Sequence, residues 1–154
     1  NDGSLLMHIR WTPNRLQSRS YDNGETWTEA TAINGILSSD SNGDLIVYTS
    51  TKNGYDKDRL ITLVDSTVWN GQRNGYPGNP KFYISYDEGY TWTNYKELYK
   101  GDAGYSSLAI LKDGSIGILA ELTKPWDGPI WFLRASIEWC NSNDNPCSPT
   151  NTKK

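Results

Sequence analysis

Two aspartates, Asp22 and Asp87, hold the same place in an octapeptide that occurs twice. The copies are Ser20-Tyr21-Asp22-Asn23-Gly24-Glu25-Thr26-Trp27 and Ser85-Tyr86-Asp87-Glu88-Gly89-Tyr90-Thr91-Trp92. A repeated carboxylate could bind a metal or act as a catalytic acid. The pattern Ser-x-Asp-x-Gly-x-Thr-Trp favours a turn instead, because Asp accepts hydrogen bonds from turn N–H groups and Gly adopts a positive φ. We therefore expect both aspartates to brace turns and both tryptophans to pack over their hairpins.

The chain has two cysteines, Cys140 and Cys147, which flank a short polar segment. This spacing suits a small disulfide loop in an exported protein, and two unpaired thiols in a reducing compartment are the alternative. A metal site would need more ligands, and the single histidine, His8, lies far away in the sequence. Nothing in the sequence requires a metal ion or another cofactor.

Short apolar stretches bounded by Gly, Asn or Asp are the elements that must position any reactive group. They cover Leu5–Arg10, Asp44–Ser50, Lys81–Ser85, Ser106–Leu111, Ile116–Glu121 and Trp131–Trp139. Their β-branched and aromatic residues, with Asp-Gly pairs between them, are typical of strands and hairpins. The segment 58–68 fits both a strand and helical spacing, so we expect an irregular insertion there. The predicted fold class is all-β.

The overall composition excludes several function classes. The chain has 154 residues and a net charge of −3, so it lacks the broad basic surface that nonspecific nucleic-acid binding needs. No apolar run approaches the roughly 20 residues of a membrane span. The chain opens with Asn1-Asp2-Gly3 and carries no charged and apolar leader. Its 7 Trp, 10 Tyr and 14 Gly fit a β protein that packs aromatic side chains.

The repeated octapeptides resemble the Asp-boxes of sialidases (neuraminidases). Two further stretches resemble the same family: Gly104–Leu108 with Leu111–Glu121 is similar to the segment around the tyrosine nucleophile, and Asn1–Arg10 to the strand that ends in a substrate-binding arginine. The resemblance implies a six-bladed β-propeller with four-stranded blades. Residues 1–139 would supply about the last two and a half blades, and 140–154 a polar tail.

The resemblance also implies roles for particular residues. Tyr105 matches the nucleophile, Arg10 and Arg73 match arginines that bind the substrate carboxylate, and Glu121 matches a carboxylate that orients a further arginine. Arg59 competes with Arg73 for its role. If the strands of each blade alternate in direction, Arg10, Arg73 and Tyr105 share one rim of the propeller and the Asp-boxes lie on the other.

The family's base glutamate, acid/base aspartate and first arginine should lie upstream of Asn1 and have no counterpart in this chain. We therefore expect the C-terminal part of a retaining exo-sialidase, inactive without the N-terminal half of the same propeller. Its substrate would be terminal sialic acid on glycoproteins, glycolipids or oligosaccharides. The resemblance implies a secreted protein whose signal peptide lies upstream. The alternatives are a relative with another sialic-acid preference or trans-sialidase activity, and a noncatalytic Asp-box propeller that binds glycans.

Overall fold

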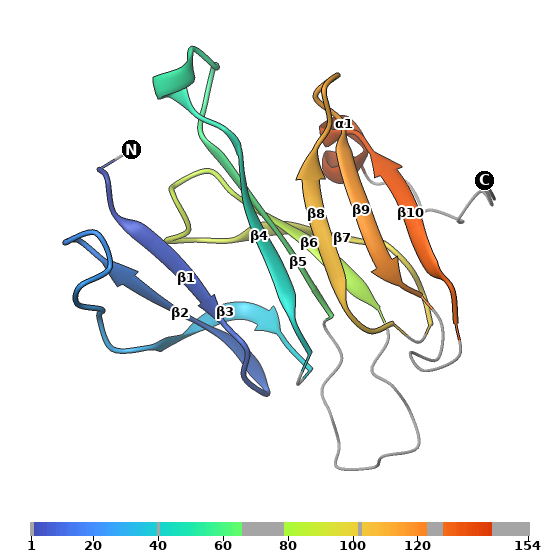
Figure 1. Ribbon diagram of the computed structural model, residues 1–154, viewed down its shortest axis with the longest axis horizontal. Helices are drawn as coiled ribbons and strands as arrows, with labels where there is room; N and C mark the ends of the chain where they lie inside the picture. The colour runs from blue at the N-terminus through green and yellow to red at the C-terminus, as the bar shows by residue number, and fades with distance from the viewer. Residues whose placement is uncertain (1, 40, 66–78, 102, 123–127, 143–154) are drawn as a thin grey trace.

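The computed structural model describes residues 2–39, 41–65, 79–101, 103–122 and 128–142, which form three antiparallel sheets in chain order (Figure 1). The first sheet holds β1 (Leu5–Ile9), β2 (Asn14–Ser20) and β3 (Thr31–Leu37). The second holds β4 (Gly43–Thr49), β5 (Arg59–Asp65), β6 (Pro80–Ser85) and β7 (Thr93–Glu97). The third holds β8 (Ser106–Ile110), β9 (Ile116–Glu121) and β10 (Ile130–Ala135). Two short helices are the 3-10 helix η1 (Thr51–Asn53) and α1 (Ile137–Asn141).

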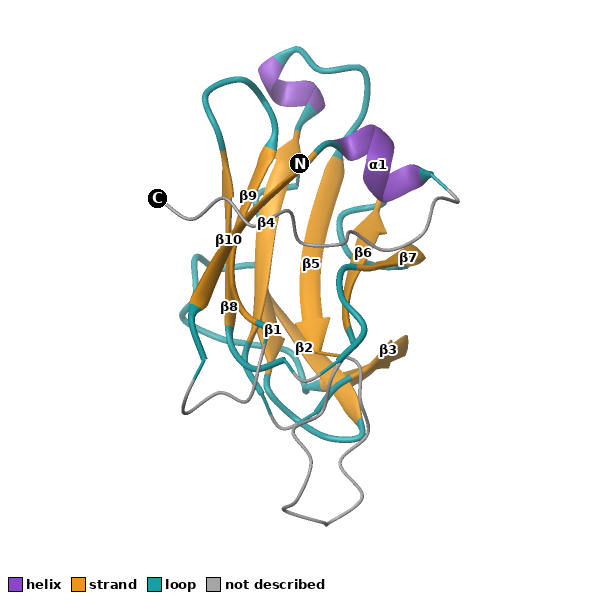
Figure 2. Cartoon of the chain, turned by 90° about the vertical axis from the view of Figure 1, so that its right-hand side faces the viewer, coloured by secondary structure: helices purple, strands orange, loops and turns teal. Residues whose placement is uncertain are grey.

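Each sheet is a meander in which consecutive strands are neighbours, as in a propeller blade. The all-β prediction is therefore confirmed, and the three sheets stand beside one another in sequence order. The described residues do not close a ring. Each repeated octapeptide, which we call an Asp-box after the motif that it resembles, joins the last two strands of its sheet, β2 to β3 and β6 to β7. Figure 2 shows α1 and η1 at one end of the strands.

The segment predicted as an irregular insertion, 58–68, was misread. It contains β5 (Arg59–Asp65), which lies between β4 and β6 in the second sheet. Ile61 and Leu63 are buried in the core shared with the third sheet, whereas Val64 is buried in the core shared with the first. A strand buried on both faces has no alternation of polar and apolar residues, so its periodicity does not distinguish it from a helix.

The strand predicted over Trp131–Trp139 ends earlier, at Ala135. Ser136 then caps α1, because its Oγ accepts a hydrogen bond from the backbone N–H of Trp139 at 3.2 Å. The helix packs its Trp139 ring edge-on against Phe82 of β6, with ring centroids 6.2 Å apart. Cys140 is buried in the same core, and Cys147 lies outside the described residues, so the predicted disulfide stays a prediction.

Two hydrophobic clusters join the sheets and hold them at fixed positions. The larger cluster fills the space between the second and third sheets with Ile61, Leu63, Phe82, Ile84, Leu108, Ile116 and Ile118, among others. The smaller one, between the first and second sheets, contains Ile33, Ile36, Val64 and Tyr83. Burial of this apolar surface contributes most of the stabilisation of the sheet arrangement. The loops at the strand ends are thereby held on a rigid scaffold.

Candidate active site

The strands β1, β5 and β9, which belong to three different sheets, end at the same edge of the molecule, the lower edge in Figure 1. Their partners β2, β4 and β8 begin at this edge because neighbouring strands are antiparallel. Arg10 directly follows β1, Tyr105 directly precedes β8, and Glu121 is the last residue of β9. The fold thus brings these three predicted site residues to one edge, which we call the site edge.

Tyr105 is held mainly through its backbone. Its N–H donates to Oε2 of Glu121 at 3.1 Å, and its carbonyl accepts from the Glu121 N–H at 3.0 Å. The N–H of Gly104 donates to the Glu121 carbonyl at 2.8 Å, and a Cβ on Gly104 would overlap the Glu121 carboxylate. The Tyr105 residue itself is 49% exposed. Glu121 therefore braces the tyrosine segment, an interaction that sequence reasoning did not predict.

A second set of contacts holds the other side of the same segment. The side-chain amide of Asn42 donates to the carbonyl of Ser106 at 3.2 Å and accepts from the Ser106 N–H at 3.3 Å. Asp44 Oδ2 accepts from the Leu108 N–H at 2.5 Å and from Ser107 Oγ at 3.3 Å. This role could not be predicted from the sequence, because the polar run before the apolar stretch of β4 is typical of an ordinary turn.

Arg10 is exposed at the site edge and lies near a buried arginine, Arg15. Burial, with a smaller contribution from the charge of Arg10, lowers the pKa of Arg15. Arg15 is only 3% exposed, and its Nη1 donates to the Ser41 carbonyl at 3.0 Å. Two guanidinium groups therefore place positive charge at this edge, and a carboxylate is a chemically matched ligand for the exposed one.

Buried polar groups next to the site edge hold its connecting segments in place. Ser39 Oγ donates to Oδ2 of Asp65 at 2.9 Å, and the Ser39 N–H donates to the Asp65 carbonyl at 3.0 Å. Both residues are buried, as are Ser38 and Ser41. These bonds tie the connection between β3 and β4 to the end of β5, so they fix the segment that carries Asn42 and Asp44.

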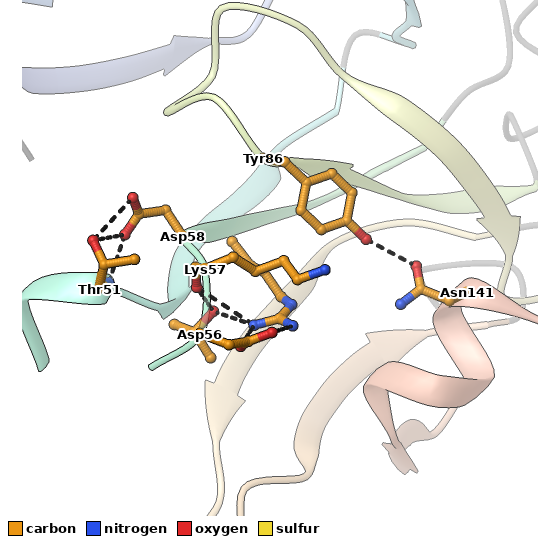
Figure 3. Close-up of polar contacts among 8 residues, drawn as sticks. Thr51, Asp56, Lys57, Asp58, Tyr86 and Asn141 are labelled. Atoms are coloured by element: carbon orange, nitrogen blue, oxygen red, sulfur yellow. Dashed lines mark hydrogen bonds and ion pairs between the residues drawn. The ribbon is translucent and has the colours of Figure 1, made fainter. Parts of the chain in front are cut away.

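The structure separates the two arginines that competed for the second carboxylate-binding role, Arg73 and Arg59. Arg73 lies outside the described residues, so its role stays a prediction. Arg59, its competitor, begins β5 at the opposite end of the sheet, where it forms an ion pair with Asp56 at 2.9 Å. Figure 3 shows this region, in which Asp58 accepts hydrogen bonds from Thr51. Arg59 is therefore too far along its strand to bind a ligand at the site edge.

The first Asp-box is a closed set of hydrogen bonds at the end opposite the site edge. Asp22 accepts from the Thr26 N–H at 2.9 Å and from Thr26 Oγ1 at 2.5 Å, and Ser20 Oγ donates to it at 2.8 Å. These bonds lower the pKa of Asp22 to about 2. Gly24, with φ of 96°, donates its N–H to Ser20 Oγ. Asp22 thus braces a turn, as expected from the sequence.

The second Asp-box repeats these bonds almost unchanged. Asp87 accepts from the Thr91 N–H at 2.8 Å and from Thr91 Oγ1 at 2.5 Å, and Ser85 Oγ donates to it at 2.8 Å. Burial opposes ionisation of Asp87, but these hydrogen bonds outweigh it and lower its pKa. Gly89, with φ of 86°, donates its N–H to Ser85 Oγ at 2.7 Å. The shared octapeptide therefore encodes a shared turn.

The two boxes differ in their surroundings. The second packs on the first sheet, where Arg19 donates to the Glu88 carbonyl and its guanidinium lies 4.3 Å from the centre of the Tyr90 ring. The rings of Trp92 and His8 are in edge contact, with centroids 5.0 Å apart. Trp27 of the first box is 37% exposed, and its Nε1 donates to Gly24 within the box. The second box thus joins two sheets.

The described residues contain no group of three or more His, Cys, Asp or Glu side chains that could hold a metal ion. Within the same residues, no helix has the length and hydropathy needed to cross a bilayer. The site edge presents a half-exposed tyrosine, a braced carboxylate and an exposed arginine.

Comparisons with known proteins place this geometry in context. No family model matches the chain. In sequence it is similar to the anhydrosialidase of Macrobdella decora, with 31% identity over 138 residues, covering 81% of this chain and 17% of that protein. In structure it is similar to the intramolecular trans-sialidase from Ruminococcus gnavus, solved in complex with oseltamivir carboxylate (TM-score 0.71, 24% identity, 92% of this chain, 32% of that chain). It is also similar to the NanB sialidase from Streptococcus pneumoniae (TM-score 0.72, 20% identity, 90% of this chain, 22% of that chain). The chain therefore spans between 17% and 32% of these proteins.

Proposed function

Because this chain is related to the sialidases and shares their fold, we propose that it carries part of the active site of a retaining exo-sialidase. Such a glycosidase releases terminal sialic acids from glycoproteins, glycolipids or oligosaccharides. The main support is the site edge, where Arg10 of the first sheet and the bonded pair Tyr105 and Glu121 of the third sheet lie. The Asp-boxes, which lie at the opposite end, have structural roles only.

The chemistry of sialic acid explains why a tyrosine would serve as the nucleophile. Sialic acid carries a carboxylate on its anomeric carbon, so a carboxylate nucleophile would approach that carbon against a like charge. A phenol is uncharged at neutral pH, since its reference pKa is near ~10. It avoids this repulsion and forms the covalent intermediate of a retaining mechanism. Tyr105, at the site edge and 49% exposed, is accessible to a sugar.

The proposed reaction has two steps. In the first, Oη of Tyr105 attacks the anomeric carbon while the glycosidic bond breaks. The phenolic proton passes to a base, and the leaving oxygen takes a proton from an acid. In the second, water attacks the same carbon and gives a proton to the group that acted as acid, the bond to Tyr105 breaks, and the phenolate regains its proton from the base. Arg10 and Arg73 hold the substrate carboxylate through paired charge-assisted hydrogen bonds, and Glu121 orients a further arginine.

We propose that the base glutamate, the acid/base aspartate and the first arginine come from the N-terminal half of the same propeller. This part would pack against the exposed apolar side chains on the outer sheets, such as Leu5 and Met7 on β1 and Leu119 and Phe132 on the third sheet. The intact mass of the purified protein, with sequencing of any companion chain, tests this arrangement. A companion without a suitable arginine, aspartate and glutamate would contradict it.

A second candidate function is intramolecular transfer, in which the tyrosyl intermediate reacts with a group of the bound sugar and not with water. It is favoured by the names of two similar proteins, an anhydrosialidase and an intramolecular trans-sialidase. If a hydroxyl of the bound sialic acid attacks in place of water, the product is an anhydro sugar, lighter than free sialic acid by one water. Mass spectrometry of the product distinguishes the two outcomes directly. Exclusive formation of free sialic acid would support hydrolysis.

Tyr105 offers the decisive test of the proposal. In the complete enzyme, a fluorinated sialyl inhibitor that traps the intermediate should label Tyr105, and Tyr105→Phe should remove nearly all turnover while keeping binding. Labelling of another residue, or unchanged turnover in Tyr105→Phe, would overturn the assignment. Binding of sialosides without any turnover in the complete wild-type protein would point to a noncatalytic glycan-binding propeller.

We also propose that the protein acts outside the cell, where its glycan substrates are displayed. A disulfide between Cys140 and Cys147 would fit an oxidising compartment. Peptide mapping under nonreducing conditions tests the pairing, and detection of the protein in the culture medium of its producing cells tests the location. A reduced protein confined to the cell interior would contradict both.

A further inference from the structure

We propose that Asn42 and Asp44 are positioning residues for Tyr105. Together they fix the position and direction of β8, the strand that Tyr105 directly precedes. This inference rests on the proposed function of Tyr105. Asn42 directly precedes β4 and Asp44 is its second residue, in the sheet adjacent to the one that carries the tyrosine. Neither would touch the substrate, so they would act only through the strand they hold.

The edge of β8 explains why such residues are needed. β8 pairs with β9 on one side only, and alternate residues of an edge strand direct their N–H and C=O groups away from their sheet. Tyr105 and Glu121 bond to each other on the β9 side, so Ser106 and Leu108 direct their N–H groups toward β4. Without partners, these groups would leave the strand free to shift along its axis.

Asn42 and Asp44 supply the missing partners with side chains instead of a strand. The Asn42 amide pairs with both the N–H and the C=O of Ser106, at 3.3 and 3.2 Å, as a neighbouring backbone would. Asp44 Oδ2 accepts from the Leu108 N–H, and its Oδ1 accepts from the Leu45 N–H at 2.8 Å, which holds the carboxylate in place. The two side chains therefore fix β8 at two successive outward-facing residues.

The same short segment also reaches the sheet that carries Arg10. Ser41, next to Asn42, accepts a hydrogen bond at its carbonyl from the buried Arg15 of β2. The segment 41–44 thus contacts the first sheet on one side and the third sheet on the other. It sets the spacing between the arginine that would bind the carboxylate and the tyrosine that would attack the anomeric carbon.

This spacing matters because the nucleophile must stand within about 3–3.5 Å of the reacting carbon, and a misplacement of ~1 Å can lower the rate ~100-fold. The hydrogen bonds described for Tyr105 act on its backbone, so the position of its Oη follows the position of β8. A loosened β8 should therefore impair the chemical step more than substrate binding.

Two variants of the complete enzyme test the inference: Asn42→Ala, and the milder Asp44→Asn, which keeps the volume of the side chain. For each folded variant we expect kcat and the rate of Tyr105 labelling by a fluorinated sialoside to fall about 10- to 100-fold, with KM changed less than about threefold. Asp58→Asn is the matched control, because Asp58 accepts hydrogen bonds from Thr51 at the other end of the same hairpin (Figure 3). It should keep wild-type kinetics.

The outcomes separate this inference from the proposed function. Wild-type labelling rates in folded Asn42→Ala and Asp44→Asn would overturn the positioning role, as would a loss equal to that of Asp58→Asn. A rise in KM with kcat unchanged would also overturn it, because a residue that positions the nucleophile should affect kcat. If Tyr105→Phe keeps full turnover in the same assay, the proposed function itself fails. If Asn42→Ala does not fold, Asp44→Asn decides the question alone.

Discussion

Glu121 and Tyr105 form a reciprocal pair in which the Glu121 carboxylate accepts from the Tyr105 N–H at 3.1 Å and the Tyr105 carbonyl accepts from the Glu121 N–H at 3.0 Å. One side chain therefore braces the candidate nucleophile with one oxygen. Its second oxygen is available for the role implied by the resemblance, which is to orient an arginine of the substrate site. The two roles are compatible and can be separated by substitution.

The charge of Glu121 should matter more for binding than for the brace. Glu121→Gln keeps an oxygen that can accept from the Tyr105 N–H but removes the negative charge. We expect KM to rise about tenfold and kcat to change little, because an arginine held by a neutral amide is less well oriented. Steady-state kinetics of the complete enzyme provide the measurement. An unchanged KM would exclude the orienting role, whereas Gly104→Ala, which displaces the carboxylate, should lower kcat as well.

The Asp-boxes should contribute to stability without affecting catalysis. Asp87→Ala removes the acceptor for Thr91 and Ser85, and because the Asp87 residue is itself exposed we expect a loss of only about 1 kcal/mol in the free energy of unfolding. Urea denaturation measures it, and Thr91→Val, which removes only the Oγ1 bond, should cost less. Turnover per folded molecule should stay at the wild-type value, since the box lies at the end opposite Tyr105. A variant that folds fully but turns over slowly would contradict this separation.

The stabilising effect of the first box should depend on pH in a defined direction. The pKa of Asp22 is lowered from 3.8 to about 2 by the hydrogen bonds from Thr26 and Ser20. The folded state therefore binds a proton less readily than the unfolded chain, so the contribution is complete above pH ~4 and is lost as the pH falls through 2. Asp22→Asn should flatten the unfolding free energy over this interval. An identical acid dependence in the variant would contradict the lowered pKa.

His8 should make the protein sensitive to mild acid. Burial, and to a smaller extent the charge of Arg15, lowers its pKa from 6.5 to about 3. Between pH 6.5 and pH 3, His8 is protonated in the unfolded chain but not in the folded state, so the free energy of unfolding falls as the pH decreases. The loss between pH 7 and pH 4 should reach at most about 3 kcal/mol.

The variant His8→Asn tests this directly, since Asn can keep the contact that His8 Nδ1 makes with Thr62 Oγ1 at 3.3 Å. The free energy of unfolding of the variant should depend less on pH between 7 and 4. His8 is the only histidine in the sequence, so an imidazole titration followed by NMR has a single signal to assign. A titration midpoint near 6.5 in the folded protein would contradict the buried, neutral state.

The exposed apolar side chains of the third sheet should drive association. Leu119 and Phe132 are opposite each other in the register of β9 and β10, and both are exposed, as is Ile130. Such a patch favours contact with another apolar surface. Phe132→Glu should reduce self-association of the isolated chain in analytical ultracentrifugation and weaken reconstitution with the proposed N-terminal half. Lys112→Glu, on an exposed turn, is the control and should do neither.

Most strands could be predicted from the sequence because one of their faces is buried and their ends carry Gly, Asn or Asp. β5 could not, because both of its faces are covered. β2 was not singled out by an apolar run, since Arg15, Ser18 and Arg19 are buried polar residues within it. In each case the pattern failed where burial depended on what the neighbouring sheet supplies, which a local pattern does not contain.

The candidate site divides in a similar way. Tyr105, Arg10 and Glu121 were found through short segments that resemble a family, and the fold places all three at one edge. Asn42 and Asp44 were missed, because their partners Ser106 and Leu108 belong to another sheet and only the docking of two sheets brings them together. Positioning residues of this kind have no sequence pattern of their own.

The two Asp-boxes also suit a fold that gains sheets by duplication during evolution. The hydrogen bonds that Asp22 accepts from Thr26, and those that Asp87 accepts from Thr91, lie inside the octapeptide. A duplicated copy of this unit would fold correctly at once, without compensating substitutions elsewhere. The contacts outside the box, such as that of Arg19 with Tyr90, could then be added one at a time. The turn can therefore be copied together with its octapeptide before the neighbouring strands have adapted to it.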